Sequence, residues 1–192
     1  MPDAEGLALH EAALEAAELG PVVEIGSYCG KSTLYLAAAV RESARDSVVF
    51  SIDHHRGSEE HQPGEQYHDP RFVDADGRVD TLAAFRTTIE QADVSDVVVG
   101  IVGASETVAR HWATPLGMVF IDGGHSSQAA RTDYKAWTPH VMAGGLLAIH
   151  DVFPDPSEGG RPPFEIYESA MASGFFEERV AKGSLRVLQR IR

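Results

Sequence analysis

The sequence contains a single cysteine, Cys29, among its 192 residues. One cysteine excludes an internal disulfide and any metal site built mainly from thiolates. Long hydrophobic runs are also missing, since no apolar stretch approaches the roughly 20 residues that a membrane-spanning helix needs. The first 20 residues are acidic, unlike a signal peptide. We therefore expect a cytoplasmic protein with no membrane partner.

Basic residues are scarce as well. Lysine and arginine together number 16 against 29 aspartates and glutamates, which gives a formal net charge of −13. Binding to nucleic acid or to an anionic membrane surface needs a basic patch, so this balance disfavours both kinds of partner. The hydrophobic fraction of 43% is sufficient for a core. The length predicts one domain over residues 1–192.

Short apolar segments alternate with helical patterns along the chain. The apolar segments lack polar alternation, as do parallel strands that are covered on both faces. This order predicts an α/β fold with a doubly wound, mostly parallel sheet. An antiparallel hairpin is expected at the C-terminal edge, in residues 175–192. The expected strands are 22–25, 47–53, 96–102, 117–122 and 145–151. The expected helices are 4–18, 31–43, 80–92, 105–112, 126–137 and 164–173.

A long polar segment, residues 54–80, interrupts this alternation, and its length is typical of a lid or binding loop. A second loop, residues 154–163, follows the fifth strand. Both are expected at the carboxyl edge of the sheet, where open α/β folds bind ligands. Solvent exposure is the favoured interpretation for the histidines of the lid, while Arg56 and Tyr67 are weak candidates for acceptor contacts. These histidines are His54, His55, His61 and His68.

The glycine loop EIGSYCGKST, residues 24–33, is similar to a phosphate-binding loop. A P-loop requires a glycine five residues before Gly30, but that position is Ile25. Tyr28 likewise breaks the dinucleotide fingerprint G-x-G-x-x-G. A nucleotide-hydrolysing protein is therefore disfavoured, and Lys31 is interpreted as a solvated helix residue. Asp53, which closes the second strand, is placed to accept ribose hydroxyls.

Five motifs follow in order at the ends of the expected strands: EIGSYCGKS, SIDHH, VGASETV, MVFIDGGH and GGLLAIHD. Together they resemble class I S-adenosylmethionine-dependent methyltransferases of the metal-dependent sugar O-methyltransferase type. The resemblance covers roughly residues 20–192. It implies a Rossmann-like fold, S-adenosyl-L-methionine as cofactor and a homodimer, for which the helix 4–18 is a candidate face.

The same resemblance implies the residues that bind the cofactor. Glu24, Ser32 and the backbone of residues 26–30 would hold the methionine part, Asp53 the ribose, and Ser105 the adenine. Ser105 has an alternative role as a helix N-cap. The full cofactor set is Glu24, Gly26, Ser27, Tyr28, Gly30, Ser32, Asp53, Ser105 and Asp122.

The resemblance also implies a metal site, for Mg²⁺ or Mn²⁺, formed by Asp122, His150 and Asp151. His150 departs from the family, which usually has a carboxylate there, and a nitrogen ligand favours softer metals than Mg²⁺. Consecutive strand residues point to opposite faces, so both His150 and Asp151 can ligate only if the strand has already ended. Asp151 is therefore the stronger candidate. Asp122 has an alternative role as N-cap of the helix 126–137.

His125 is the candidate catalytic base, because its D-x-x-H spacing from Asp122 matches the sugar O-methyltransferases and its resting pKa suits proton transfer. The expected acceptor is a carbohydrate hydroxyl, given the polar lid and the lack of an aromatic-rich acceptor segment. The alternative enzyme is a catechol-type O-methyltransferase acting on a phenol or natural product. A non-catalytic cofactor-binding module is a further alternative, which intact Asp122, His125 and Asp151 disfavour.

Overall fold

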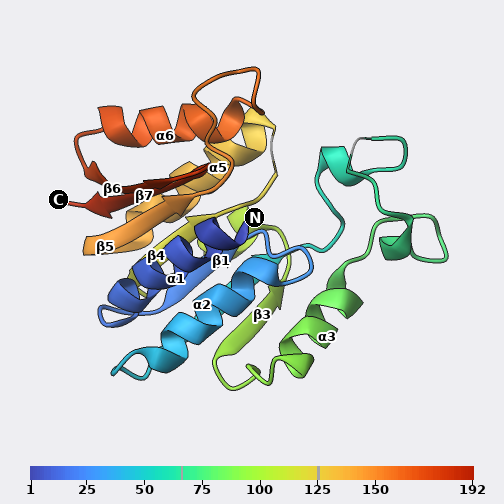
Figure 1. The fold of residues 1–192 in the computed structure, drawn as a ribbon, viewed down its shortest axis with the longest axis horizontal. Helices are drawn as coiled ribbons and strands as arrows, with labels where there is room; N and C mark the ends of the chain where they lie inside the picture. The colour runs from blue at the N-terminus through green and yellow to red at the C-terminus, as the bar shows by residue number, and fades with distance from the viewer. Residues whose placement is uncertain (66, 125) are drawn as a thin grey trace.

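The computed structural model describes residues 1–65, 67–124 and 126–192. Seven strands form one sheet in the order β3-β2-β1-β4-β5-β7-β6 (Figure 1). Strands β1 to β5 pair in parallel, while β7 runs antiparallel to both β5 and β6. The strands are β1 (Val22–Ile25), β2 (Val49–Asp53), β3 (Val98–Val102), β4 (Leu116–Ile121), β5 (Val141–Ile149), β6 (Phe176–Lys182) and β7 (Leu185–Arg190).

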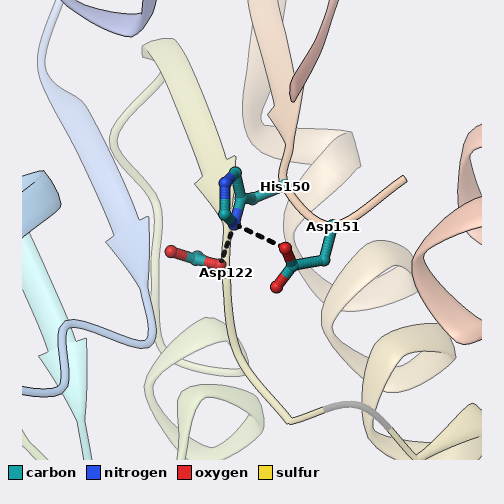
Figure 2. Close-up of side chains that lie close together, drawn as sticks. All are labelled: Asp122, His150 and Asp151. Atoms are coloured by element: carbon teal, nitrogen blue, oxygen red, sulfur yellow. Dashed lines mark hydrogen bonds and ion pairs between the residues drawn. The ribbon is translucent and has the colours of Figure 1, made fainter. Parts of the chain in front are cut away.

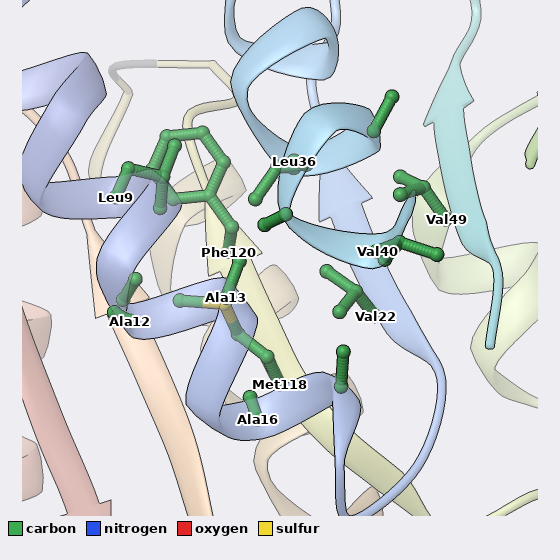
Figure 3. Close-up of a cluster of buried hydrophobic side chains, with 14 of the residues drawn as sticks. Leu9, Ala12, Ala13, Ala16, Val22, Leu36, Val40, Val49, Met118 and Phe120 are labelled. Atoms are coloured by element: carbon green, nitrogen blue, oxygen red, sulfur yellow. The ribbon is translucent and has the colours of Figure 1, made fainter. Parts of the chain in front are cut away.

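Helices cover both faces of the sheet and create two apolar cores. On one face, α1, α2 and α3 pack against inward side chains such as Val22, Met118 and Phe120 (Figure 3). On the other face, α4, α5 and α6 enclose a second cluster around Trp137, which is fully buried. The helices are α1 (Asp3–Ala17), α2 (Lys31–Glu42), α3 (Leu82–Gln91), α4 (Ser105–Ala109), α5 (Ser127–Trp137) and α6 (Pro162–Ala172).

The expected fold class is confirmed, including the antiparallel C-terminal hairpin. Two boundaries differ from the prediction by more than two residues. Strand β5 begins at Val141, because its pairing with β4 shifts register between Leu116 and Met118, and Gly144 has a φ of 82° within that irregular segment. Helix α4 ends at Ala109, after which Trp112 packs edge-on against Trp137 with ring centroids 5.4 Å apart.

The segment 54–80 projects to one side of the sheet in Figure 1. It contains two short 3₁₀ turns, Glu59–His61 and Pro70–Phe72, and an isolated bridge between Val73 and Val79. Arg56 holds its two ends together through ion pairs to Asp74 at 3.0 Å and Asp80 at 3.4 Å. In the part of the chain that the structure describes, we find no helix with the length and hydropathy of a membrane span.

Close packing of α1 on β4 depends on Gly117. A β-carbon at this position would lie 2.1 Å from the carbonyl oxygen of Ala16 and 2.8 Å from that of Gly20. Neither backbone oxygen can move without displacing the end of α1. We predict that Gly117→Ala lowers the free energy of unfolding by about 1–3 kcal/mol, as overpacking of a core usually does. Chemical denaturation would measure this loss.

Gly103→Ala is the matched control, because a β-carbon there meets no atom within 4 Å. Its free energy of unfolding should change by less than about 0.5 kcal/mol. Equal stability of the two variants would contradict the packing argument.

Candidate active site

The strand order reverses between β1 and β4, and the loops that follow these two strands meet at the carboxyl edge of the sheet. Gly26, which follows β1, has a φ of 85°, and a β-carbon there would lie 2.5 Å from the carbonyl oxygen of Asp122. The amide of Asp122 in turn donates to the carbonyl of Ile25 at 2.9 Å. In open α/β sheets this reversal is where ligands bind. The two motifs predicted to hold cofactor and metal are therefore in direct contact.

Asp122, His150 and Asp151 converge at the ends of β4 and β5 (Figure 2). The Nδ1 atom of His150 lies 3.0 Å from Oδ1 of Asp122 and 3.2 Å from Oδ1 of Asp151. Strand β5 ends at Ile149, and Asp151 has a left-handed backbone with a φ of 56°. The strand has thus ended before these residues, which was the condition for both side chains to act as ligands.

These three side chains suit a divalent cation in their chemistry. One ligand atom from each, two carboxylate oxygens and a ring nitrogen, lies within 4.8 Å of the others. The separations of 3.0 and 3.2 Å between Nδ1 of His150 and the two carboxylate oxygens are consistent with neighbouring ligands around one ion, whose bonds would be roughly 2.0–2.2 Å long. Asp122 is not the N-cap of α5, because Ser126 occupies that position and accepts from the amide of Ala129.

His150 is 5% exposed and sits among carboxylates. Burial alone lowers the pKa of His150, but hydrogen bonds to Asp122 and Asp151 outweigh it and raise the pKa to about 10. Its other ring nitrogen, Nε2, lies 2.7 Å from Oε2 of Glu5 on α1. The sequence analysis did not identify Glu5. The one sequence signal for it is its position one helical turn before Leu9, on the buried face of α1.

The glycine loop after β1 is supported from below by Glu24. Its carboxylate is fully buried and accepts hydrogen bonds from the hydroxyls of Ser32, Thr33 and Ser51, the last two at 2.6 Å. Burial raises the pKa of Glu24 to about 7 despite these bonds. Glu24 and Ser32 are therefore hydrogen-bonded to each other beside the glycine loop. Their contact with the cofactor stays a prediction.

Asp53 joins the loop to the end of β2. Its Oδ2 accepts from the amides of Ser27 at 3.0 Å and Tyr28 at 2.8 Å, and its Oδ1 accepts from the amide of His55 at 2.7 Å. Tyr28 has a left-handed φ of 48°, and Gly30, at the start of α2, has a φ of 90°. The buried hydroxyl of Ser27 has no hydrogen-bond partner among the described residues. An unpaired buried hydroxyl in a glycine loop is consistent with a polar ligand.

Ser105 is the first residue of α4 and not its N-cap, which is Ala104. Its hydroxyl donates to Oδ1 of Asp133, a buried residue of α5 that sequence reasoning missed. Burial raises the pKa of Asp133 to about 6, although the bond from Ser105 lowers it. The available signal was position, because Asp133 shares the buried stripe of α5 with Ala130 and Trp137.

The lid contacts the glycine loop through aromatic rings. The ring of Tyr28 stacks on His61 at 4.8 Å and meets the ring of Phe72 edge-on at 5.7 Å. His55 is 3% exposed and its Nδ1 lies 2.9 Å from the hydroxyl of Thr81, so the interpretation of this histidine as a solvated loop residue is wrong. His54 is exposed as expected.

Two further predictions have different outcomes. Lys31 is exposed and pairs with Asp3 at 3.1 Å, as expected for a solvated helix residue. His125, the candidate base, lies outside the described residues.

The chain belongs to a methyltransferase domain family, whose sequence profile matches residues 23–152. The expectation that the protein is a methyltransferase is therefore confirmed.

Solved structures share the fold over nearly the whole chain. The O-methyltransferase NovP has a TM-score of 0.73 at 16% identity, covering 96% of this chain and 78% of NovP. TomG from Streptomyces achromogenes, an O-methyltransferase of tomaymycin synthesis solved with S-adenosylmethionine, has a TM-score of 0.66 at 15% identity, covering 100% and 82%. An rRNA methylase from Streptococcus thermophilus has a TM-score of 0.59 at 13% identity, covering 95% and 94%. The names of proteins that share this fold thus refer to different methyl acceptors.

The buried carboxyl of Glu24 predicts a pH dependence of stability. The folded protein retains the Glu24 proton up to about pH 7, whereas a glutamate with the ordinary value of 4.5 releases it earlier. The free energy of unfolding should therefore fall as pH rises between these two values. Glu24→Gln should remove a part of this fall on the order of 3 kcal/mol. Urea denaturation at pH 5 and pH 8 would measure it.

Glu11→Gln is the control, since Glu11 is exposed on α1. Its pH dependence should equal that of the wild type. A Glu24→Gln variant that keeps the full wild-type slope would contradict the assignment of the buried proton.

Proposed function

We propose that the protein is an S-adenosylmethionine-dependent O-methyltransferase that uses a divalent cation and acts on a carbohydrate hydroxyl. The observation that carries the proposal is the convergence of Asp122, His150 and Asp151 beside the glycine loop. Membership of the methyltransferase family supports methyl as the group that is transferred. The homodimer implied by the sequence resemblance is part of the proposal.

The residues present fit the proposed cofactor. Gly26 has no side chain, so a ligand of the loop can approach its backbone closely. The hydroxyl of Ser27 is buried without a partner among the described residues, and Asp53 is the last residue of β2, at the edge of the loop. A carboxylate oxygen has more than one acceptor position, so Asp53 can keep its bonds to the loop and still accept a ribose hydroxyl. Ser105, held by Asp133, lies at the start of α4, where the adenine is expected.

Alkyl hydroxyls are poor nucleophiles at neutral pH, because almost none of the oxygen is ionised. A bound divalent cation would lower the pKa of the hydroxyl and fix its position. Asp122 and Asp151 supply the negative charge for that cation, and His150 supplies a nitrogen once it has lost its proton. His125 takes the hydroxyl proton as general base, a role proposed from its spacing to Asp122.

The proposed acceptor is the 1-hydroxyl of a 3-O-methylmannoside in polysaccharide biosynthesis. The polar lid over the glycine loop supports a sugar, since its side chains offer many hydrogen-bonding groups. A catechol-type phenol or natural product is the second candidate. It is favoured by one observation, the rings of Tyr28, His61 and Phe72, which form an aromatic surface where the lid meets the loop.

We predict that labelled methyl is transferred from S-adenosylmethionine to a short 3-O-methylated mannoside with Mg²⁺, and that EDTA abolishes the transfer. Asp151→Asn should lower kcat and Mn²⁺ affinity at least about 10-fold, because it removes a charged ligand. Affinity for S-adenosylhomocysteine, measured by calorimetry, should stay unchanged. Asp46→Asn, an exposed aspartate, is the control.

Transfer that survives EDTA would exclude the metal while keeping the methyltransferase. Transfer to catechol but not to the mannoside would exclude the carbohydrate acceptor in favour of the second candidate.

We further predict that His125→Ala abolishes turnover and leaves cofactor affinity within about 3-fold of the wild type, because general bases contribute roughly 100-fold or more to rate without binding the donor. Single-turnover assays and calorimetry would separate the two effects. Turnover near the wild-type rate would eliminate His125 as the base.

A further inference from the structure

Glu5 connects α1 to the candidate metal residues. Its Oε2 lies 2.7 Å from Nε2 of His150, and both residues are 5% exposed. The opposite ring nitrogen, Nδ1, faces Asp122 and Asp151. One imidazole thus lies between a carboxylate on α1 and the pair of carboxylates at the ends of β4 and β5. Residue 5 lies outside the stretch 23–152 that the family profile matches.

The turn of the C-terminal hairpin forms a socket for Glu5. Its Oε1 accepts from the amide of Ser184 at 2.7 Å, and the Ser184 hydroxyl lies 3.3 Å from the same oxygen. A β-carbon on Gly183 would lie 2.0 Å from Oε1, so the turn accommodates the carboxylate only because this residue is glycine. Both carboxylate oxygens therefore have fixed partners, and the side chain has no freedom to rotate away from His150.

We propose that Glu5 is a positioning residue, which holds His150 with Nε2–H directed at α1 and leaves the Nδ1 lone pair for a divalent cation bound by Asp122 and Asp151. This inference rests on the proposed function. A neutral imidazole has one donor nitrogen and one acceptor nitrogen. A carboxylate only accepts, so Glu5 keeps a proton on Nε2. Asp122 and Asp151 hold a second proton on Nδ1 in the metal-free protein. A bound cation would displace the Nδ1 proton, and Nδ1 could then ligate while Nε2–H stays on Glu5. Carboxylates that orient a metal-binding histidine in this way typically change metal affinity by roughly 10–100-fold.

Glu5→Gln separates this role from a merely structural one. Glutamine has the same shape, and its carbonyl can still accept from the amide of Ser184. Its NH₂ group would then face Nε2 of His150 as a donor. The imidazole can satisfy that donor only by moving its proton to Nδ1, where it points at Asp122 and Asp151. The variant therefore keeps the hydrogen bond from the Ser184 amide but offers the cation a protonated nitrogen.

The experiment uses the full chain and Mn²⁺ as the probe, with free Mn²⁺ measured by electron paramagnetic resonance. We expect Glu5→Gln to lower Mn²⁺ affinity about 10–100-fold. Its Tm and its affinity for S-adenosylhomocysteine should stay close to those of the wild type. The control Glu11→Gln, the same change on the exposed side of α1, should keep full Mn²⁺ affinity.

A second measurement holds even if Glu5→Gln fails to fold. Nitrogen-15 spectra of histidine-labelled wild-type protein with Zn²⁺, a diamagnetic probe, should show His150 bound through Nδ1 and protonated on Nε2. Coordination through Nε2 would overturn the inference, as would wild-type Mn²⁺ affinity in Glu5→Gln. Wild-type protein that binds neither ion would overturn the metal in the proposed function, and the inference with it. If the wild type binds both ions and Glu5→Gln binds Mn²⁺ with the same affinity, the inference is overturned while the proposed function stands.

Discussion

The close approach of the β1 and β4 loops is the constraint on which the rest of the site depends. Since β1 and β4 are neighbours at the point where the strand order reverses, their carboxyl ends share one crevice. Gly26 lets the two backbones touch, with no space for a side chain between them. Any ligand of the glycine loop consequently lies beside Asp122. The proposed donor and acceptor sites are thereby placed together by backbone geometry, before any side chain contributes.

Three buried carboxyl groups, on α1, β1 and α5, each have at least one oxygen paired with a polar side chain. Glu24 accepts from three hydroxyls, Asp133 accepts from Ser105, and Glu5 is paired with His150. A buried carboxylate is costly unless its oxygens are satisfied, and fully satisfied networks fix the orientation of their members. Each of these groups therefore acts as a rigid support for a loop or ring at the carboxyl edge of the sheet.

Most of the fold could be predicted from the sequence, because uninterrupted apolar runs such as residues 22–25 and 117–122 are typical of strands covered on both faces. The convergence of Asp122, His150 and Asp151 was also predictable, since all three close neighbouring strands. Glu5, Asp133 and His55 were not identified, because each becomes a site residue only through a partner far away in the chain. Local sequence patterns carry no information about those pairings. From the sequence, a buried glutamate on a helix cannot be distinguished from an exposed one.

The contacts of Glu5 span almost the whole chain, with 145 residues separating it from His150 and 179 from Ser184. A chain that is synthesised from its N-terminus has α1 available long before its partners exist. Helix α1 can pack on α2 early, but its glutamate stays without its native partners until residue 184 has left the ribosome. Contacts of such long range form late and slow the folding of a domain. Completion of the candidate metal site thus requires that the β6–β7 hairpin has been synthesised.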